Sequence, residues 1–233
     1  GKAETLTFLI PNLKGGVSQG IGETPKALEK VDPNFRENIS KSSAYWGEKP
    51  FTSGPVYIGA FVMMLFIFSL FLMKSWHIWS LVFVTILAIL LAWGRHFMPL
   101  TDWFIDYFPL YNKFRAVSTF LIIPMFTIPL IAVIGLKRIY DYPFLLQDKS
   151  KQFWFSFAIT AGTCIVFWLF PGAFFSFFSS MELDQFAKAI EQGITQAQID
   201  AYMSNLEIAR KELLKSDALR SLIMIILGTA VLR

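Results

Sequence analysis

The sequence of 233 residues has little of what soluble enzymes and cysteine-rich domains depend on. Its single cysteine, Cys164, excludes a disulfide scaffold and a cysteine-rich metal site. Its two histidines, His77 and His96, leave little for a histidine-based metal centre. Charged residues make up 16% of the chain, against roughly 25% in soluble domains. These shortages exclude a disordered protein, a coiled coil and an ordinary soluble enzyme domain.

Apolar and aromatic side chains are present in excess. Hydrophobic residues make up 55% of the chain and aromatic residues 17%, with a mean hydropathy of +0.51. The net charge of +4 suits either nucleic acid or anionic lipid. The lysines and arginines are dispersed and form no nucleic-acid footprint. The composition therefore predicts membrane lipid as a partner and no nucleic acid.

Uncharged stretches predict an all-α, polytopic transmembrane helical bundle. Residues 55–180 are expected to hold four spans, because a bilayer core needs about 20 apolar residues per helix. A fifth, truncated span is expected over residues 217–233. Because the chain starts without methionine and ends inside an apolar run, we expect an internal fragment of a longer protein. The four complete spans are expected at residues 55–73, 78–94, 117–136 and 153–178.

Two segments are expected outside the membrane. Residues 1–54 are rich in glycine and proline and predict an irregular loop segment. Residues 181–216 are polar but carry apolar residues at helical spacing, which predicts an amphipathic helical hairpin on the membrane surface. Positive charge is densest in the short turns after the first and third spans, which places those turns in the cytoplasm. The loop segment, the loop at 95–116 and the hairpin would then share the outer face.

The loop at 95–116 is the most informative stretch for chemistry. Asp102 and Asp106 are four residues apart and share a face if the loop is helical. Either could accept a sugar hydroxyl, bind a divalent cation or act as a general base. Arg115 could pair with a phosphate through two N–H donors, and Lys113 could add a point charge. Such a loop suits a ligand with an apolar tail and an anionic head.

A second interpretation of this loop needs no ligand. Charged residues at helix ends are commonly interfacial anchors, and aromatic residues there form a belt at the membrane surface. Asp102 would then cap an interfacial helix after Pro99. On the residues alone, we favour this interpretation.

The N-terminal segment offers two further candidates. Asn12, Gly15 and Gly16 could form a loop whose backbone amides approach an anion, although such a loop is more often a simple turn. The stretch YWGEKPFTSGPVY, residues 45–57, could form a sugar-stacking rim, or an interfacial belt, which we favour.

Three motifs carry a family resemblance: FLIPNLKGG at 8–16, YWGEKPFTSGPVY at 45–57 and WGRHFMPLTDWFIDYFPLYNKFRAVS at 93–118. Their sequences, order and spacing resemble the YfhO-like family of bacterial membrane proteins, in the form found in Bacteroidetes. That family is regarded as related to the GT-C glycosyltransferases, which take a sugar from a polyprenyl-phosphate carrier on the outer face.

The resemblance implies a multi-pass protein of the bacterial inner membrane that transfers a sugar with inversion. By resemblance, Arg115 and Lys113 would contact the carrier phosphate, and Asn112 and Tyr111 would shape the site. The loop with Asn12 would lie nearby. The key acidic residue, which would serve as base or metal ligand, would usually lie in a loop upstream of this chain, and family members are far longer. No cofactor is implied beyond a divalent cation.

A non-catalytic membrane module remains the alternative. The chain could be part of a lipid-handling transporter of the flippase type, or a scaffold whose hairpin binds a partner. The expected spans carry no charge in their middle, which argues against an ion-coupled transporter. The sequence carries no signal for an oligomeric state.

Overall fold

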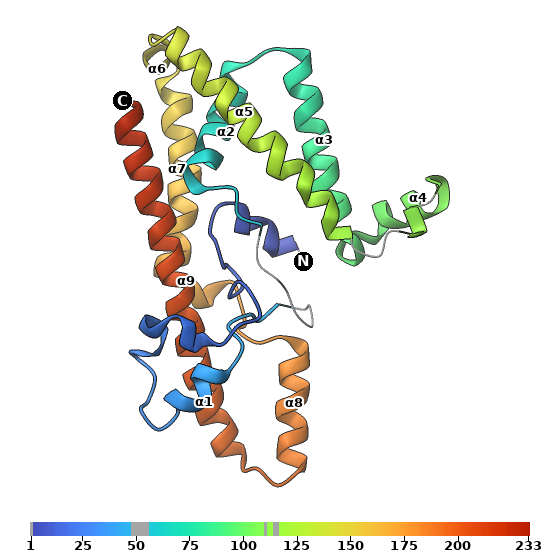
Figure 1. Ribbon diagram of the computed structural model, residues 1–233, viewed down its shortest axis with the longest axis vertical. Coiled ribbons are helices and arrows are strands. Elements are labelled where there is room, and N and C mark those ends of the chain that lie inside the picture. The colour runs from blue at the N-terminus through green and yellow to red at the C-terminus, as the bar shows by residue number, and fades with distance from the viewer. Residues whose placement is uncertain (1, 48–55, 110, 114–116) are drawn as a thin grey trace. The chain divides into compact units, whose positions relative to one another are not determined.

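The computed structural model describes residues 2–47, 56–109, 111–113 and 117–233 (Figure 1). These residues form helices and loops and no strand, apart from one isolated β-bridge between Gly20 and Ser43. The prediction of an all-helical fold is confirmed.

The α-helices are α1 (Arg36–Lys41), α2 (Ala60–Leu72), α3 (Trp76–Ala92), α4 (Met98–Tyr107), α5 (Ile122–Asp141), α6 (Leu145–Asp148), α7 (Ser150–Leu169), α8 (Ser180–Glu191) and α9 (Gln196–Leu232). The 3-10 helices are η1 (Lys2–Phe8), η2 (Ile21–Glu23), η3 (Pro25–Leu28), η4 (Gly94–Phe97), η5 (Tyr111–Lys113), η6 (Val117–Leu121) and η7 (Pro171–Ala173).

The chain divides into two compact units. The first unit comprises residues 1–9, 56–162 and 223–233, and the second comprises residues 10–55 and 163–222. Helices α7 and α9 each contribute residues to both units. Each unit is described below by itself.

Among the residues that the structure describes, two helices are long and apolar enough to cross a membrane, and a bent pair could provide a third. The two are residues 117–141, formed by η6 and α5, and α7. The bent pair joins α3 to residues 94–107 at an angle of 111°. The sequence predicts four complete spans, whereas the described helices provide two, or three with the bent pair. The difference lies in the expected first span, where residues 56–59 are not helical and α2 has only 13 residues. At 1.5 Å per residue, α2 is about 20 Å long, short of a bilayer core of about 30 Å.

Small and hydroxyl-bearing residues set the helix packing in the first unit. Gly135 of α5 lies directly against Ser69 of α2, so that a side chain at position 135 would meet the serine. Thr85 of α3 and Thr127 of α5 form a buried hydroxyl–hydroxyl hydrogen bond of 2.6 Å. Each threonine hydroxyl also lies within hydrogen-bond distance of a carbonyl of its own helix, and one of the two donates there while the other donates to its threonine partner. Such close, partly polar contacts are typical of helix pairs in membranes.

The second unit has its own apolar core, which the sequence reading did not anticipate. Buried apolar residues of the N-terminal segment pack against buried residues of α9. Half-buried aromatic residues of α8 and α9 complete the cluster. The N-terminal segment, expected as an irregular loop, therefore packs against the helical hairpin expected at residues 181–216. The placement of that hairpin on a membrane surface stays a prediction. The core comprises Ile21, Ala27, Val31, Ile39, Ala44, Leu206 and Ala209, with Phe186 and Tyr202 packed against it.

The hairpin turns at Gly193. This glycine has a φ of +99°, a conformation that favours glycine, between the end of α8 and the start of α9. At the start of α9, the Gln198 carboxamide oxygen accepts bonds from the Thr195 backbone N–H and hydroxyl. A complete capping box lies at the start of α8, between Ser179 and Glu182. The apolar end of α9, residues 221–232, carries no charge, and the expected fifth span stays a prediction.

Candidate functional site: a pocket in the second unit

The predicted acidic candidates lie on the exposed side of α4. Asp102 and Asp106 are both exposed and belong to the first unit. Over the residues that the structure describes, no three His, Cys, Asp or Glu side chains gather into a potential metal site. The geometry of the described residues therefore gives the two aspartates no companion for metal binding.

The rest of the predicted phosphate site is described only in part. Arg115 lies outside the described residues, Asn112 lies in η5, and Lys113 is exposed. Tyr111 is only 6% exposed, with its ring between Phe104 and Phe120. Burial raises the pKa of the Tyr111 hydroxyl, which has no hydrogen-bond partner among the described residues. Tyr111 therefore packs inside the first unit.

The glycine loop of the N-terminal segment closes onto its own chain. Gly15 and Gly16 have φ values of +86° and +80°. A Cβ on Gly15 would collide with the Ala44 carbonyl, and one on Gly16 with the Asn12 side chain. The Trp46 backbone N–H donates to the Lys14 carbonyl at 3.1 Å. The glycines thus permit a close approach between two backbone segments, and anion binding by Asn12, Gly15 and Gly16 stays a prediction.

Asn12 also reaches helix α9. Its side chain forms a hydrogen bond with Asp217, a half-buried carboxyl group on the part of α9 that belongs to the second unit. Burial raises the pKa of Asp217 to about 6, although the bond from Asn12 and the charge of Arg220 each lower it. The predicted candidates thus divide between the units: Asn12, Gly15 and Gly16 in the second, and Asp102, Asp106, Tyr111, Asn112 and Lys113 in the first.

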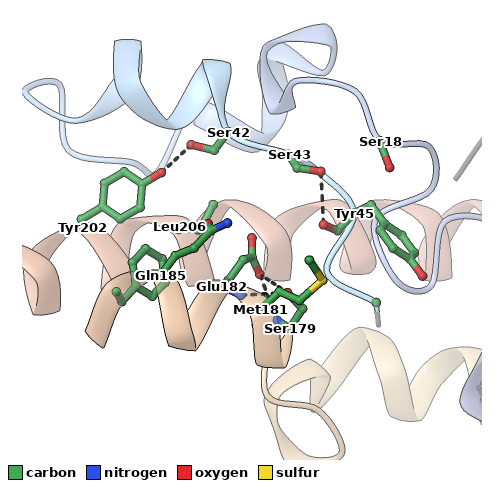
Figure 2. A pocket seen from close by; sticks show the side chains of 12 residues that line it. Ser18, Ser42, Ser43, Tyr45, Ser179, Met181, Glu182, Gln185, Tyr202 and Leu206 are labelled. Carbon is green, nitrogen blue, oxygen red and sulfur yellow. Dashed lines mark hydrogen bonds between the residues drawn. The ribbon is translucent and has the colours of Figure 1, made fainter. Parts of the chain in front are cut away.

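A pocket of about 340 Å³ lies within the second unit. It sits between the segment around residues 42–47 and the helices α8 and α9 (Figure 2). Ligand sites in proteins usually measure about 300–1,000 Å³, so this volume suits a small ligand. Its described lining residues are Ser18, Ser42, Ser43, Tyr45, Gly47, Ser179, Met181, Glu182, Gln185, Phe186, Tyr202 and Leu206.

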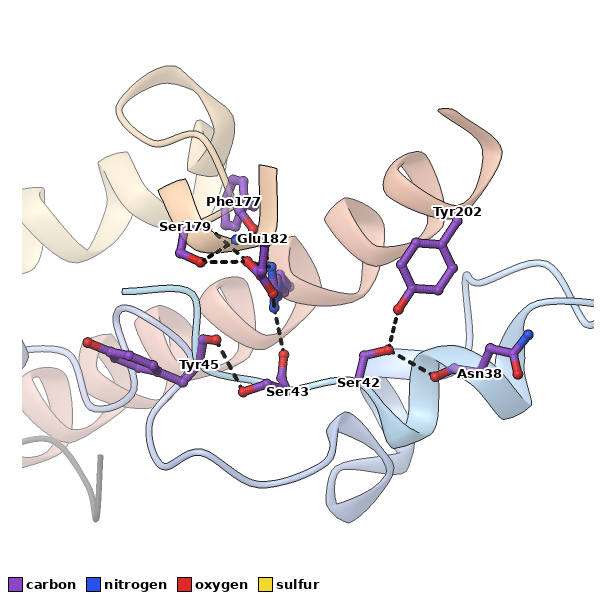
Figure 3. A network of polar contacts seen from close by, with 9 residues as sticks. Asn38, Ser42, Ser43, Tyr45, Phe177, Ser179, Glu182 and Tyr202 are labelled. Atoms are coloured by element: carbon purple, nitrogen blue, oxygen red, sulfur yellow. Dashed lines mark hydrogen bonds and ion pairs between the residues drawn. The ribbon is translucent and has the colours of Figure 1, made fainter. Parts of the chain in front are cut away.

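A buried arginine fixes the carboxylate that lines this pocket. Arg210 of α9 is fully buried, and its guanidinium pairs with both carboxylate oxygens of Glu182. Figure 3 labels Glu182 together with Ser43 and Phe177, whose carbonyls accept the other bonds of this guanidinium. The guanidinium donates to the carbonyls of Phe177 at 2.6 Å and Ser43 at 2.7 Å. Arg210 therefore ties the start of α8 to the segment that carries Ser43. Because arginine presents its donors in a rigid fork, this network fixes the position of Glu182.

Hydroxyl bonds hold the opposite end of the pocket. The hydroxyls of Ser42 and Tyr202 lie 2.6 Å apart, and Ser42 also donates to the Asn38 carbonyl at 2.9 Å. The Tyr202 ring packs edge-on against Phe186 of α8, with centroids 5.9 Å apart. The pocket thus combines fixed polar atoms with apolar ring surface.

Sequence reasoning missed most of this pocket. It singled out Tyr45 as the start of a rim motif, while Glu182, Tyr202 and Arg210 were assigned no function. The serine and glutamate three residues apart at 179 and 182 were a visible signal for the start of α8. Nothing local marks Arg210, because its partners Ser43 and Glu182 lie 167 and 28 residues away in the chain.

Comparison with models of protein families, with curated proteins and with solved structures finds no match for this chain.

Proposed function

We propose that this chain is part of a multi-pass membrane protein of the bacterial cell envelope that handles sugars carried on polyprenyl phosphate, and that its second unit binds the saccharide. The pocket is the observation that carries this proposal. Hydroxyl, amide and carboxylate groups beside aromatic ring surface suit a small polyhydroxylated ligand. The apolar helices and the resemblance to the YfhO-like family support a membrane setting with a lipid carrier.

Sugar transfer itself would depend on residues beyond those assigned to the pocket. Glu182 is engaged by Arg210, so it is an unsuitable general base. In a GT-C-like protein the key acidic residue, acting as base or metal ligand, would lie upstream. Arg115 and Lys113 would hold the carrier phosphate. The role proposed for this chain is therefore to bind and position the lipid-linked sugar.

A lipid-binding assay tests this proposal. The chain would be purified into nanodiscs and incubated with a polyprenyl-phosphate sugar or with the same polyprenyl phosphate lacking the sugar. We expect saturable binding that is tighter for the sugar-bearing lipid. Equal binding of the two lipids, or binding of neither, would contradict the proposal.

A scaffold function is the second candidate, and the surface of α8 favours it. Met181, Leu183 and Ile190 of this short helix are each more than a third exposed, as is Ile194 after it. Exposed apolar residues of this kind are typical of a protein-binding face. The paired substitution Leu183→Asp with Ile190→Asp would abolish binding of a protein partner, and it would leave binding of the lipid-linked sugar unchanged.

A further inference from the structure

The described hydrogen bonds of the pocket leave several acceptors that can face a ligand. Glu182 Oε2 accepts from the Ser179 backbone N–H at 2.9 Å, from the Ser179 hydroxyl at 3.3 Å and from Arg210 at 3.0 Å. Glu182 Oε1 accepts from Arg210 only, among the bonds described. A carboxylate oxygen has two lone pairs, so Oε1 can accept one more hydrogen bond. The Glu182 side chain is 20% exposed and lines the pocket, so a ligand can reach it.

The Tyr202 hydroxyl offers a second acceptor. Ser42 has one hydroxyl proton, which it donates to the Asn38 carbonyl. The proton in the bond between Ser42 and Tyr202 must therefore come from Tyr202. The Tyr202 oxygen keeps its lone pairs for a ligand. The Ser43 hydroxyl likewise donates to the Tyr45 carbonyl at 3.2 Å and keeps its acceptor capacity.

Cationic donors are missing from the described lining. None of its twelve residues is lysine, arginine or histidine. The two terminal nitrogens of Arg210 each donate two bonds within the protein, which uses all four of their protons. A phosphate accepts hydrogen bonds and donates few, and it would stand beside the Glu182 carboxylate. The described lining is therefore unsuited to the anionic group of a lipid carrier.

We propose that this pocket takes the neutral sugar ring of a glycosylated ligand, with Glu182 Oε1 and the Tyr202 hydroxyl oxygen accepting its hydroxyl protons, and that phosphate binds elsewhere. The inference rests on the proposed function for the source of the sugar. The apolar face of the ring would lie on Phe186 and Met181, which supply carbon surface at the same pocket. Tyr202 is thus a specificity-determining residue of the site.

Titration of the chain in nanodiscs with simple probes tests this inference. The probes are methyl hexopyranosides, inorganic phosphate and ethanolamine, each followed by ligand-observed NMR. We expect the glycosides to bind and the other two probes to give no saturable signal. Saturable binding of phosphate or ethanolamine at this pocket, with no binding of any glycoside, would overturn the inference.

Two variants locate the binding. Tyr202→Phe keeps the ring and removes the acceptor, and it should weaken glycoside binding about fivefold to tenfold, the effect of one hydrogen bond. Met181→Trp fills the pocket from an exposed position and should abolish the binding. Tyr140→Phe, at a residue that is 85% exposed in the first unit, is the matched control and should change nothing. Glycoside binding that survives both pocket variants would also overturn the inference.

The outcomes separate this inference from the proposed function. Glycoside binding that Met181→Trp abolishes, in a chain that binds no polyprenyl-phosphate sugar, would support the pocket and contradict the lipid-linked function. Binding of the lipid-linked sugar that is unaffected by Met181→Trp and Tyr202→Phe would support the function and contradict this pocket as its sugar site.

Discussion

At the scale of single residues, the second unit depends on a fully buried arginine whose charge Glu182 balances. Replacing Glu182 with glutamine keeps the shape of the side chain and removes its charge. A buried charge that loses its partner costs about 3–5 kcal/mol of stability. We therefore expect Glu182→Gln to lower the unfolding midpoint of the second unit strongly, measured by the fluorescence of the buried Trp46 during thermal unfolding.

The matched control for that change is Glu191→Gln, at an exposed position near the end of the same helix. It should leave the midpoint within experimental error. A Glu182→Gln variant that unfolds at the temperature of the original protein would show that the buried pair contributes nothing to stability.

The glycine loop gives a second prediction. Gly15→Ala adds a methyl group where the Ala44 carbonyl already lies, at a φ of +86°. We expect a loss of stability well above the roughly 1–2 kcal/mol of left-handed strain alone. Gly193→Ala separates the collision from the backbone strain, because Gly193 has a φ of +99° but open space around it, so only the strain remains. Equal losses in these two variants, by chemical denaturation, would contradict the packing role of Gly15.

A third prediction concerns pH and Asp217. Its pKa of about 6 in the folded protein lies above its ordinary 3.8, so the folded state binds the proton more tightly. The resulting stabilisation is present below about pH 4 and is lost as the pH rises through 6. We expect Asp217→Asn to remove this part of the pH dependence, measured as unfolding midpoints from pH 4 to pH 7.5. The control Asp184→Asn, at an exposed site, should keep the pH dependence of the original protein. If Asp217→Asn also keeps it, the assignment of this pH dependence to Asp217 is refuted.

Only part of the candidate site was predictable at this scale. The sequence identified Asn12, Gly15 and Gly16 as unusual, because glycines beside a proline and an asparagine signal a tight turn. It could not show that the turn closes onto Ala44, since that contact depends on the tertiary fold. The Arg210 network was hidden for the same reason: a charged residue on a helix usually faces solvent, and its burial here depends on distant carbonyls.

At the scale of elements, α9 carries the core of the second unit and α8 covers less of it. Leu206 of α9 is 2% exposed within the core, whereas Leu183 of α8 is 45% exposed. We expect Leu206→Asp to unfold the second unit, because an unpaired carboxylate would be buried there. Leu183→Asp should leave it folded, as limited proteolysis would show for both. Equal protease resistance of the two variants would contradict this division of roles.

The sequence predicted the long apolar helices better than the other elements. The uncharged stretches within α3, α5 and α7 are long, and each of these helices was expected from them. The expected fourth span at residues 153–178 is too long, because α7 ends at Leu169, before Pro171. Helix α2 is shorter than expected because residues 56–59 are not helical and Gly59, directly before the helix, has a φ of +118°. Composition cannot reveal such a backbone feature. The core of residues 21–44 was also hidden, because its apolar residues have no helical period and their partners come from α9.

At the scale of the whole molecule, the proposal joins apolar helices to a unit with its own core and pocket. Residues 117–141 and α7 have the length and composition of membrane spans. The second unit supplies a pocket rich in hydrogen-bond acceptors. The proposal needs both features: a membrane setting for the carrier lipid and a pocket for its sugar. Its central claim is that the sugar of a lipid-linked ligand occupies the pocket beside Glu182.

Photoaffinity labelling tests that claim most directly. A polyprenyl-phosphate sugar carrying a diazirine on its sugar ring would be irradiated with the chain in nanodiscs, and the labelled peptides identified by mass spectrometry. We predict labels at Met181, Gln185 and Tyr202, which an excess of the free methyl glycoside removes. Labels confined to the loop at 95–116, with none in the second unit, would contradict the claim.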